Sequence, residues 1–502
     1  MRNRARTLRA LIAEPPDLAV RVGFNGLAQI APIVVVFAIT PLLLERLGLD
    51  RFGIWSLALI ILGTLTILDG GIAASLARFF ASYAARDDRA DSGRLLLGSF
   101  LFFVLFGLGL TLAVFPLAPG IVGLLQVPSG LRGEAEVVLR WLPPLATLAL
   151  MADATAALLQ GNGRFRALAA SMLASSGTLA AAVIVLVQSG AQLEDLMIAV
   201  ALRYAVQVVT GLALAAPHVS IRRPFLPTRA TVRELWHYAS RMQLSALTGF
   251  VNSEMDALVI AAVLPIRYVG LYTIGMQAAS AVRSIPLYAF APLLTRLTMI
   301  FRNQGRAATA AEFGRLERRW LPIVLGYGVV AVAAIGFSLP AWLGDRYALS
   351  GVVAGVLLIG YMIHVGLTGV RTCYVRAVGR PGLETRYSLV WTISNSVLTI
   401  PLAILGGVVG VVTATAVTGV AASIYFVILC RRTEQLPVAV PARRWWGLAL
   451  VAAGMTVTGE LAIAFTDLHG FLALALTGVP ALVALVTFAS GLRQPARVRL
   501  AT

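Results

Sequence analysis

The chain consists largely of apolar runs long enough to cross a lipid bilayer, separated by short connections rich in arginine. A membrane-spanning helix needs about 20 predominantly apolar residues, and by that measure the sequence contains about fourteen spans. Apolar residues make up 59% of the chain and charged residues 13%. A soluble domain carries roughly 25% charged residues. The pattern therefore predicts an all-α, polytopic membrane protein and excludes a water-soluble fold.

The distribution of arginine over the short connections predicts the orientation of the chain. All 41 basic residues are arginine, and thirty of them fall in one alternating set of connections against six in the other. Positively charged connections stay in the cytoplasm, so we expect both termini inside and a multi-pass protein of a bacterial cytoplasmic (inner) membrane. The net charge of +18 then reflects topology and attraction to anionic lipids, not nucleic-acid binding. No connection is long enough for a soluble catalytic domain, which argues against an enzyme.

A short motif recurs far downstream and indicates an internal repeat. RFGIW at 51–55 resembles RYVGLY at 267–272, at an offset of 217 residues. Three pairs keep this register to within one residue: Gly53 with Gly270, Gly163 with Gly379, and Arg78 with Arg296. We predict two six-helix lobes at 1–217 and 218–434, parallel repeats about an axis along the membrane normal, then a helix pair at 435–502. Such lobes would enclose a V-shaped central cavity and rock for alternating access; a duplicated structural protein without transport is the alternative.

Four stretches carry a family resemblance that covers most of 18–434. LLLERLGLDRFGIWSLALIILGTLTILDGGIAASLARF resembles the first helical hairpin of the oligosaccharide and polysaccharide flippases, and LLQGNGRFRA resembles their fourth-to-fifth connection. NSEMDALVIAAVLPIRYVGLYTIG resembles their seventh helix and the start of the eighth. VRAVGRPGLETRYSLVWTISNSVLTIPLAILGGVVGVVTATAV resembles their tenth to twelfth helices, with the asparagine of the eleventh at Asn395. The family shares a superfamily with multidrug and toxin extrusion transporters and lipid II flippases.

The resemblance implies transport of a polyprenyl-diphosphate-linked oligosaccharide to the outer leaflet, for cell-surface polysaccharide synthesis. Membrane lipids, a coupling proton or sodium ion and a polysaccharide polymerase are the further partners that we expect, with no cofactor. An ion-coupled multidrug exporter is the first alternative, although that group usually has twelve helices and prefers acids in its cavity. A membrane-embedded glycosyltransferase or polymerase is the second, although it would need a sizeable outer loop. The last two helices either contact the lipid tail or only pack on the second lobe.

Five arginines lie inside predicted spans, where a charge is costly without a function or a partner: Arg21, Arg203, Arg241, Arg283 and Arg371. Arg203 and Arg283 are at least eight residues from either end of helices predicted at 195–216 and 269–295. Their forked, charge-assisted hydrogen bonds suit a diphosphate in a wet cavity; pairing with a buried carboxylate is the alternative. The other three lie nearer the cytoplasm and could instead snorkel to the interface. With Asn395, these arginines form the predicted substrate site.

Buried acids provide the candidates for ion coupling. Asp256 occupies the position of the family's seventh-helix acid, so we expect it to line the cavity and to pair with an arginine or carry the coupling ion. Glu254 lies two residues away and points in another direction on a helix. Asp69 is followed by two glycines, which predicts a helix break with Asp69 as an N-terminal cap or, alternatively, an ion site. Asp153 is assigned to pairing within the bundle.

Overall fold

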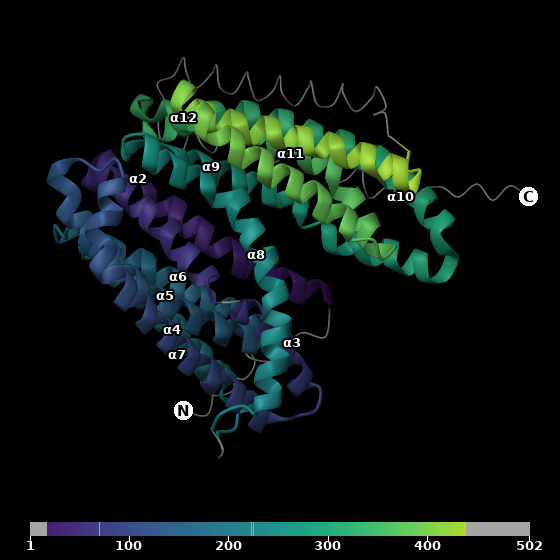
Figure 1. Ribbon diagram of the computed structural model, residues 1–502, viewed down its shortest axis with the longest axis horizontal. Coiled ribbons are helices and arrows are strands. Elements are labelled where there is room, and N and C mark those ends of the chain that lie inside the picture. The colour runs from purple at the N-terminus through teal and green to yellow at the C-terminus, as the bar shows by residue number, and fades with distance from the viewer. Residues whose placement is uncertain (1–17, 70, 222, 224, 438–502) are drawn as a thin grey trace, which may run out of the picture. The chain divides into compact units, whose positions relative to one another are not determined.

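The computed structural model describes residues 18–69, 71–221, 223 and 225–437, and every regular element in this part of the chain is helical (Figure 1). Its elements are α2 (Leu18–Ile67), α3 (Ile72–Ala84), α4 (Arg89–Leu124), η1 (Ser129–Leu131), α5 (Arg132–Gly161), α6 (Phe165–Gln188), α7 (Leu196–Ala215), η2 (Ala216–His218), α8 (Arg229–Val263), α9 (Arg267–Leu287), α10 (Phe290–Leu343), η3 (Asp345–Tyr347), α11 (Ala348–Ala377) and α12 (Gly382–Glu434). The prediction of an all-α fold is confirmed. The predicted helix pair at 435–502 lies almost wholly outside the described residues.

Eight helices of the described part are long and apolar enough to cross a membrane. Their surfaces are apolar as well: Leu112 and Leu124 on α4 and Leu405 on α12 are 69%, 76% and 82% exposed. A soluble protein would bury side chains of this size, whereas lipid tails accept them without cost. The exposed leucines are therefore the lipid-facing surface of a polytopic membrane protein, as the sequence predicts. The total of fourteen spans stays a prediction.

The chain divides into two compact units. Unit 1 takes in the chain as far as Glu254 together with Pro265–Gly270, and unit 2 takes in Met255–Leu264 and the chain from Leu271 onward. Within unit 1, α5 packs against α2, α3, α4 and α7, and α6 packs against α2 and α7 (Figure 1). Within unit 2, α11 packs against both α10 and α12. The predicted lobes and their symmetry remain predictions, and α8 contributes residues to both units.

Three long helices contain a glycine break where the sequence predicts a connection between two spans. The breaks lie at Gly48 in α2, Gly305 in α10 and Gly407 in α12, with φ of 73°, 77° and 57°. Glycine adopts positive φ without the steric cost that a Cβ would bring. Each of the three helices can therefore turn at its glycine between two helical segments. The halves of α12 then meet closely, because a Cβ on Gly410 would overlap the carbonyl group of Leu402.

Candidate functional site

Asp256 lies at the centre of a buried polar cluster in unit 2. Its side chain on α8 is 3% exposed. Its carboxylate accepts hydrogen bonds from Thr415 Oγ1 at 2.5 Å, Tyr272 Oη at 3.3 Å and Asn395 Nδ2 at 3.4 Å. The four residues come from α8, α9 and both halves of α12. No arginine is among the hydrogen-bonding partners recorded for this carboxylate in the described part of the chain, so its neighbours are neutral oxygen and nitrogen groups.

A second layer of oxygen atoms surrounds Asn395, which the sequence placed in the substrate site. Its Oδ1 lies 3.3 Å from Thr399 Oγ1, 3.2 Å from Thr415 Oγ1 and 3.2 Å from Thr418 Oγ1. All four side chains are buried, at 2% exposure or less. Asn395 therefore joins the Asp256 cluster. The three threonines were missed in the sequence because threonine is common in membrane helices.

The cluster around Asp256 and Asn395 contains more hydrogen-bond acceptors than hydrogen-bond donors. Thr399 Oγ1 lies 2.8 Å from the carbonyl oxygen of Asn395, and Thr418 Oγ1 lies 2.7 Å from that of Ala414. A hydroxyl has a single hydrogen, so a threonine that donates to its own helix cannot also donate to Asn395 Oδ1. These contacts are then oxygen against oxygen. A cluster of this composition can accept a proton or a small cation.

Asp69 caps a helix in unit 1. It is 3% exposed and sits between α2 and α3. Its two carboxylate oxygens accept from the backbone N–H groups of Gly71 at 2.8 Å and Ala73 at 2.6 Å. Gly71 has a φ of 78°, which supplies the sharp turn. The predicted helix break is confirmed, and Asp69 accepts from the first turn of α3 as predicted, although the N-cap position itself is taken by Gly71.

A charged group lies on the inner helices of unit 1. Asp153 on α5 is exposed although it belongs to a long apolar helix, and it lies near enough to Asp69 and Arg203 for their charges to act on it. Arg203 on α7 is half-buried, with its guanidinium 5.1 Å from the centre of the Tyr204 ring and a buried Nε that has no hydrogen-bond partner. The sequence assigned Asp153 only to bundle pairing. Its exposure makes it a second charged group available beside Arg203.

Arg283 in unit 2 lies on an aromatic ring. Its guanidinium is 4.3 Å from the centre of the Tyr361 ring, the position of a cation–π contact. Next on α11, the His364 ring lies 4.6 Å from Trp391, and its Nδ1 is 2.9 Å from Ser423 Oγ. The predicted helix at 269–295 is wrong at its end, because α9 stops at Leu287. Arg283 therefore lies close to a helix terminus and not deep within an unbroken span.

The other residues predicted for the substrate and ion sites are not placed by the structure as open binding groups. Arg371 on α11 is 1% exposed and forms an ion pair with Glu317 of α10, also buried. This is the bonding pattern of a structural ion pair in unit 2, not of a residue that faces a cavity. Glu254 is half-buried. Arg21 lies in α2 and Arg241 in α8, but their side chains lie outside the described residues.

Comparison with solved structures identifies the architecture. The lipid II flippase MurJ in an inward closed conformation has a TM-score of 0.66 at 13% identity, over 93% of this chain and 98% of that one. An inward-facing multidrug resistance transporter of the MATE family, in the MOP superfamily, has a TM-score of 0.63 at 15% identity, over 82% of this chain and 94% of that one. The fold is thus that of membrane flippases and exporters.

Sequence comparison gives the family. A family model described as polysaccharide biosynthesis protein matches residues 18–298, more than half of the chain. A Shigella flexneri protein assigned as an O-antigen transporter is 20% identical over 360 residues, which are 71% of this chain and 84% of that protein. The chain belongs to the polysaccharide biosynthesis protein family. The family predicted from the sequence is confirmed, and the predicted transporter class agrees with these relatives.

Proposed function

We propose that this protein moves a polyprenyl-diphosphate-linked oligosaccharide from the cytoplasmic to the outer leaflet of a bacterial inner membrane. The observation that carries the proposal is the family match over residues 18–298. The name of the Shigella flexneri relative and the fold shared with a lipid II flippase support the same substrate class. Transport would proceed by alternating access of two lobes.

Arg203 in unit 1 and Arg283 in unit 2 are each, considered separately, our candidate for binding the diphosphate of the substrate. Both side chains are half-buried, and among the described residues neither guanidinium group forms an ion pair with a carboxylate. A planar guanidinium offers paired N–H donors to phosphate oxygens. Asp153, exposed beside Arg203, would accept hydrogen bonds from sugar hydroxyls. Arg371 is left out of this site because Glu317 already engages it.

The coupling ion, a proton or sodium, would bind in the Asp256 cluster. If Asp256 is protonated, its hydroxyl can donate to Asn395 once the amide is reversed, and the amide N–H₂ then donates to the threonines. If Asp256 is charged, a sodium ion can accept the lone pairs of Asn395, Thr399 and Thr415, since hard cations prefer oxygen ligands. The proton would supply a missing hydrogen-bond donor, and the sodium ion would instead coordinate the oxygen lone pairs directly.

Depletion of the protein in its host tests the substrate. Polyprenyl-linked lipids are measured by mass spectrometry, and an impermeant label reports the leaflet that holds them. We expect one diphosphate-linked oligosaccharide to accumulate on the cytoplasmic leaflet. Unchanged lipid-linked intermediates, together with increased sensitivity to cationic compounds, would instead establish a multidrug exporter.

Arginine variants test the substrate site. Arg203→Ala and Arg283→Ala each remove charge-assisted bonds of about 1.5–3 kcal/mol, which corresponds to roughly a 10- to 150-fold loss of apparent affinity. The lysine variants keep the charge but not the fork, so they should recover only part of this loss. Arg386→Ala, at an exposed position near the start of α12, is the matched control. Equal transport by all these variants would remove both arginines from the site.

A further inference from the structure

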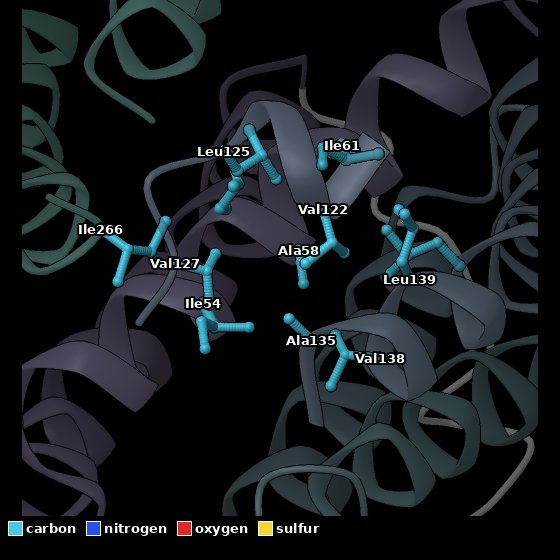
Figure 2. Close-up of a pocket in the computed structure, with 12 residues that line it drawn as sticks. Ile54, Ala58, Ile61, Val122, Leu125, Val127, Ala135, Val138, Leu139 and Ile266 are labelled. Atoms are coloured by element: carbon cyan, nitrogen blue, oxygen red, sulfur yellow. The ribbon is translucent and has the colours of Figure 1, made fainter. Parts of the chain in front are cut away.

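Two hollows in the described part of unit 1 differ in chemical character. The first lies among α2, α4 and α5, and the described residues that line it are all aliphatic, such as Ile54, Val122 and Leu139 (Figure 2). Hydrocarbon can fill it, but these side chains offer nothing to a charge. The second, of about 540 Å³, lies along the start of α8 and is lined by arginine, tryptophan and histidine side chains among others. Of the two, the second hollow is therefore the one that can recognise a charged group.

The second hollow follows one face of α8. The helical residues that line it are Arg229, Val232, Arg233, Trp236, His237 and Ser240. Their spacings of three and four residues place them in one stripe along the helix. Arg229, Arg233 and Trp236 are exposed, Trp236 to 55%. Glu234 is exposed too, but it lies about 100° around the helix from Arg233 and is not among the described residues that line the hollow. The six residues, which we call the α8 stripe, therefore combine cationic and aromatic side chains.

The opposite face of α8 is packed into unit 1 and thereby fixes the direction of the stripe. Leu235 and Ala239 are buried in the apolar core that unit 1 builds from α3, α4 and α5. A Cβ on Gly71 would overlap the carbonyl oxygen of Ala239, so α8 runs close against the break between α2 and α3. Gln243 Nε2 then donates to the carbonyl oxygen of Ile67 at 2.8 Å. The α8 stripe cannot turn inward without breaking these contacts.

The connection before α8 extends the chemistry of the stripe. Ile221, Phe225 and Leu226 are exposed, and the Arg223 guanidinium lies 5.7 Å from the centre of the Phe225 ring. The predicted topology places this end of α8 at the cytoplasmic surface of the bilayer. Aromatic side chains and arginines gather at this level of a membrane protein, where rings lie among the head groups and cations meet anionic lipid. The stripe and the connection therefore have the composition of a surface that contacts lipid head groups.

The arginines of this surface have no carboxylate partner within the described part of the chain. Arg223, Arg229 and Arg233 take part in none of its ion pairs. In unit 2, by contrast, the buried Glu434 pairs with Arg306. A guanidinium group carries five N–H donors and a permanent charge, so an arginine without a carboxylate partner keeps them for an anionic ligand.

We propose that the α8 stripe binds the phosphate head group of an anionic phospholipid from the surrounding bilayer. Arg229 and Arg233 lie one turn apart on the same face, with about 5–6 Å between their Cβ atoms, so both guanidinium groups can reach one phosphate. Trp236 lies about 10 Å along α8 from Arg229, toward the bilayer centre, where it can cover the upper part of the acyl chains. This lipid is a bound component of the protein and not the transported molecule, so the inference goes beyond the proposed function and does not depend on it.

Lipid binding to the purified full-length protein tests the site. Native mass spectrometry gives the affinity for phosphatidylglycerol added to protein in a neutral detergent, with phosphatidylcholine as the neutral probe. The double variant Arg229→Gln, Arg233→Gln should bind phosphatidylglycerol about 30-fold more weakly, the factor for two arginines that contribute about 1 kcal/mol each near anionic lipid. Arg431→Gln with Arg432→Gln is the matched control, because it removes the same charge from exposed positions at the end of α12. Equal losses in the two double variants, or equal affinities of the wild type for the two lipids, would overturn the site.

Fluorescence quenching provides a second test that locates the lipid and does not depend on the arginine variants folding well. The protein is placed in phosphatidylcholine nanodiscs that contain a small fraction of either phosphatidylglycerol or phosphatidylcholine with brominated acyl chains, which quench nearby tryptophan. The quenching that Trp236→Phe removes should be larger with the brominated phosphatidylglycerol, whereas Trp141→Phe, at an exposed position on α5, should remove the same amount with either lipid. An equal Trp236 share with both lipids would overturn the proposal. Displacement of the brominated phosphatidylglycerol by a tighter-binding polyprenyl diphosphate would overturn it too, by assigning the α8 stripe to the transported lipid.

Discussion

Replacing Thr415 by valine removes one oxygen from the Asp256 cluster while keeping the shape of the side chain. Thr415 Oγ1 lies 2.5 Å from the Asp256 carboxylate and 3.2 Å from Asn395 Oδ1, so it is the atom that joins the two layers of the cluster. A hydrogen bond to a charged group contributes about 1.5–3 kcal/mol. At 1.4 kcal/mol per factor of ten, the affinity for the coupling ion should fall roughly 10- to 150-fold.

The assay is transport by the purified protein in proteoliposomes, driven in separate experiments by a sodium gradient and by a pH gradient. Thr415→Val should shift the concentration dependence on the ion that drives transport and leave the dependence on substrate nearly unchanged. Thr413→Val is the matched control, because Thr413 lies on the same helix, is half-buried and outside the cluster, and donates to the carbonyl oxygen of Val409 at 2.7 Å.

Wild-type dependence on both ions in the Thr415→Val protein would refute the assignment of the cluster to ion coupling. An equal shift in Thr415→Val and Thr413→Val would refute it too, because the effect would then belong to the helix and not to the cluster. Asp256→Asn separates the two ions further. A neutral amide imitates a protonated acid, so a proton-coupled protein should lose its response to pH.

Three predictions concern stability. Asp69→Ala removes a helix cap and should lower the free energy of unfolding by about 1 kcal/mol, measured as a shift in thermal melting; Asp69→Asn, which can still accept, should keep most of it, and equal melting of both variants would contradict the cap. Arg371→Met should lower the free energy of unfolding by about 3–5 kcal/mol, because it leaves Glu317 buried without its cation. Adding Glu317→Leu should recover part of that loss, and a double variant less stable than the single one would count against the ion pair. Gly410→Ala should lower the free energy of unfolding by about 1–3 kcal/mol, because the added Cβ overpacks the break in α12. Gly406→Ala should leave it nearly unchanged, because nothing lies within 4 Å of the added Cβ. Equal losses in the two variants would contradict the close approach at Gly410.

The features that the sequence predicted correctly are governed by local physics. Long apolar runs predict helices in lipid whatever their neighbours are, because a backbone in a bilayer must satisfy its own hydrogen bonds. The Asp69 cap is local in the same way: the acid and the backbone N–H groups that donate to it lie within four residues of one another. The family resemblance also follows the order of motifs along the chain and needs no contact between distant residues.

The composition of the Asp256 cluster was decided by the tertiary structure. Asp256 and Thr415 are 159 residues apart, and nothing in either local sequence selects the other. The sequence marked Asp256 and Asn395 as separate candidates for an ion and a substrate, whereas packing of α8 against α12 places them in one cluster. Arg371 shows the same limit, because its partner Glu317 lies 54 residues away and turns a predicted substrate residue into half of a buried ion pair.

By itself, then, the sequence determined that this protein folds in a lipid bilayer, that its chain is helical and that one motif is repeated. These depend on the composition and spacing of neighbouring residues. The tertiary structure alone decided which buried groups are paired and which remain available, and that the two copies of the repeated motif pack glycine against glycine. Those outcomes depend on contacts between segments that are distant in the chain, separated by 54 residues for Arg371 and Glu317 and by 217 for Gly53 and Gly270. Such contacts leave no mark on either segment read alone.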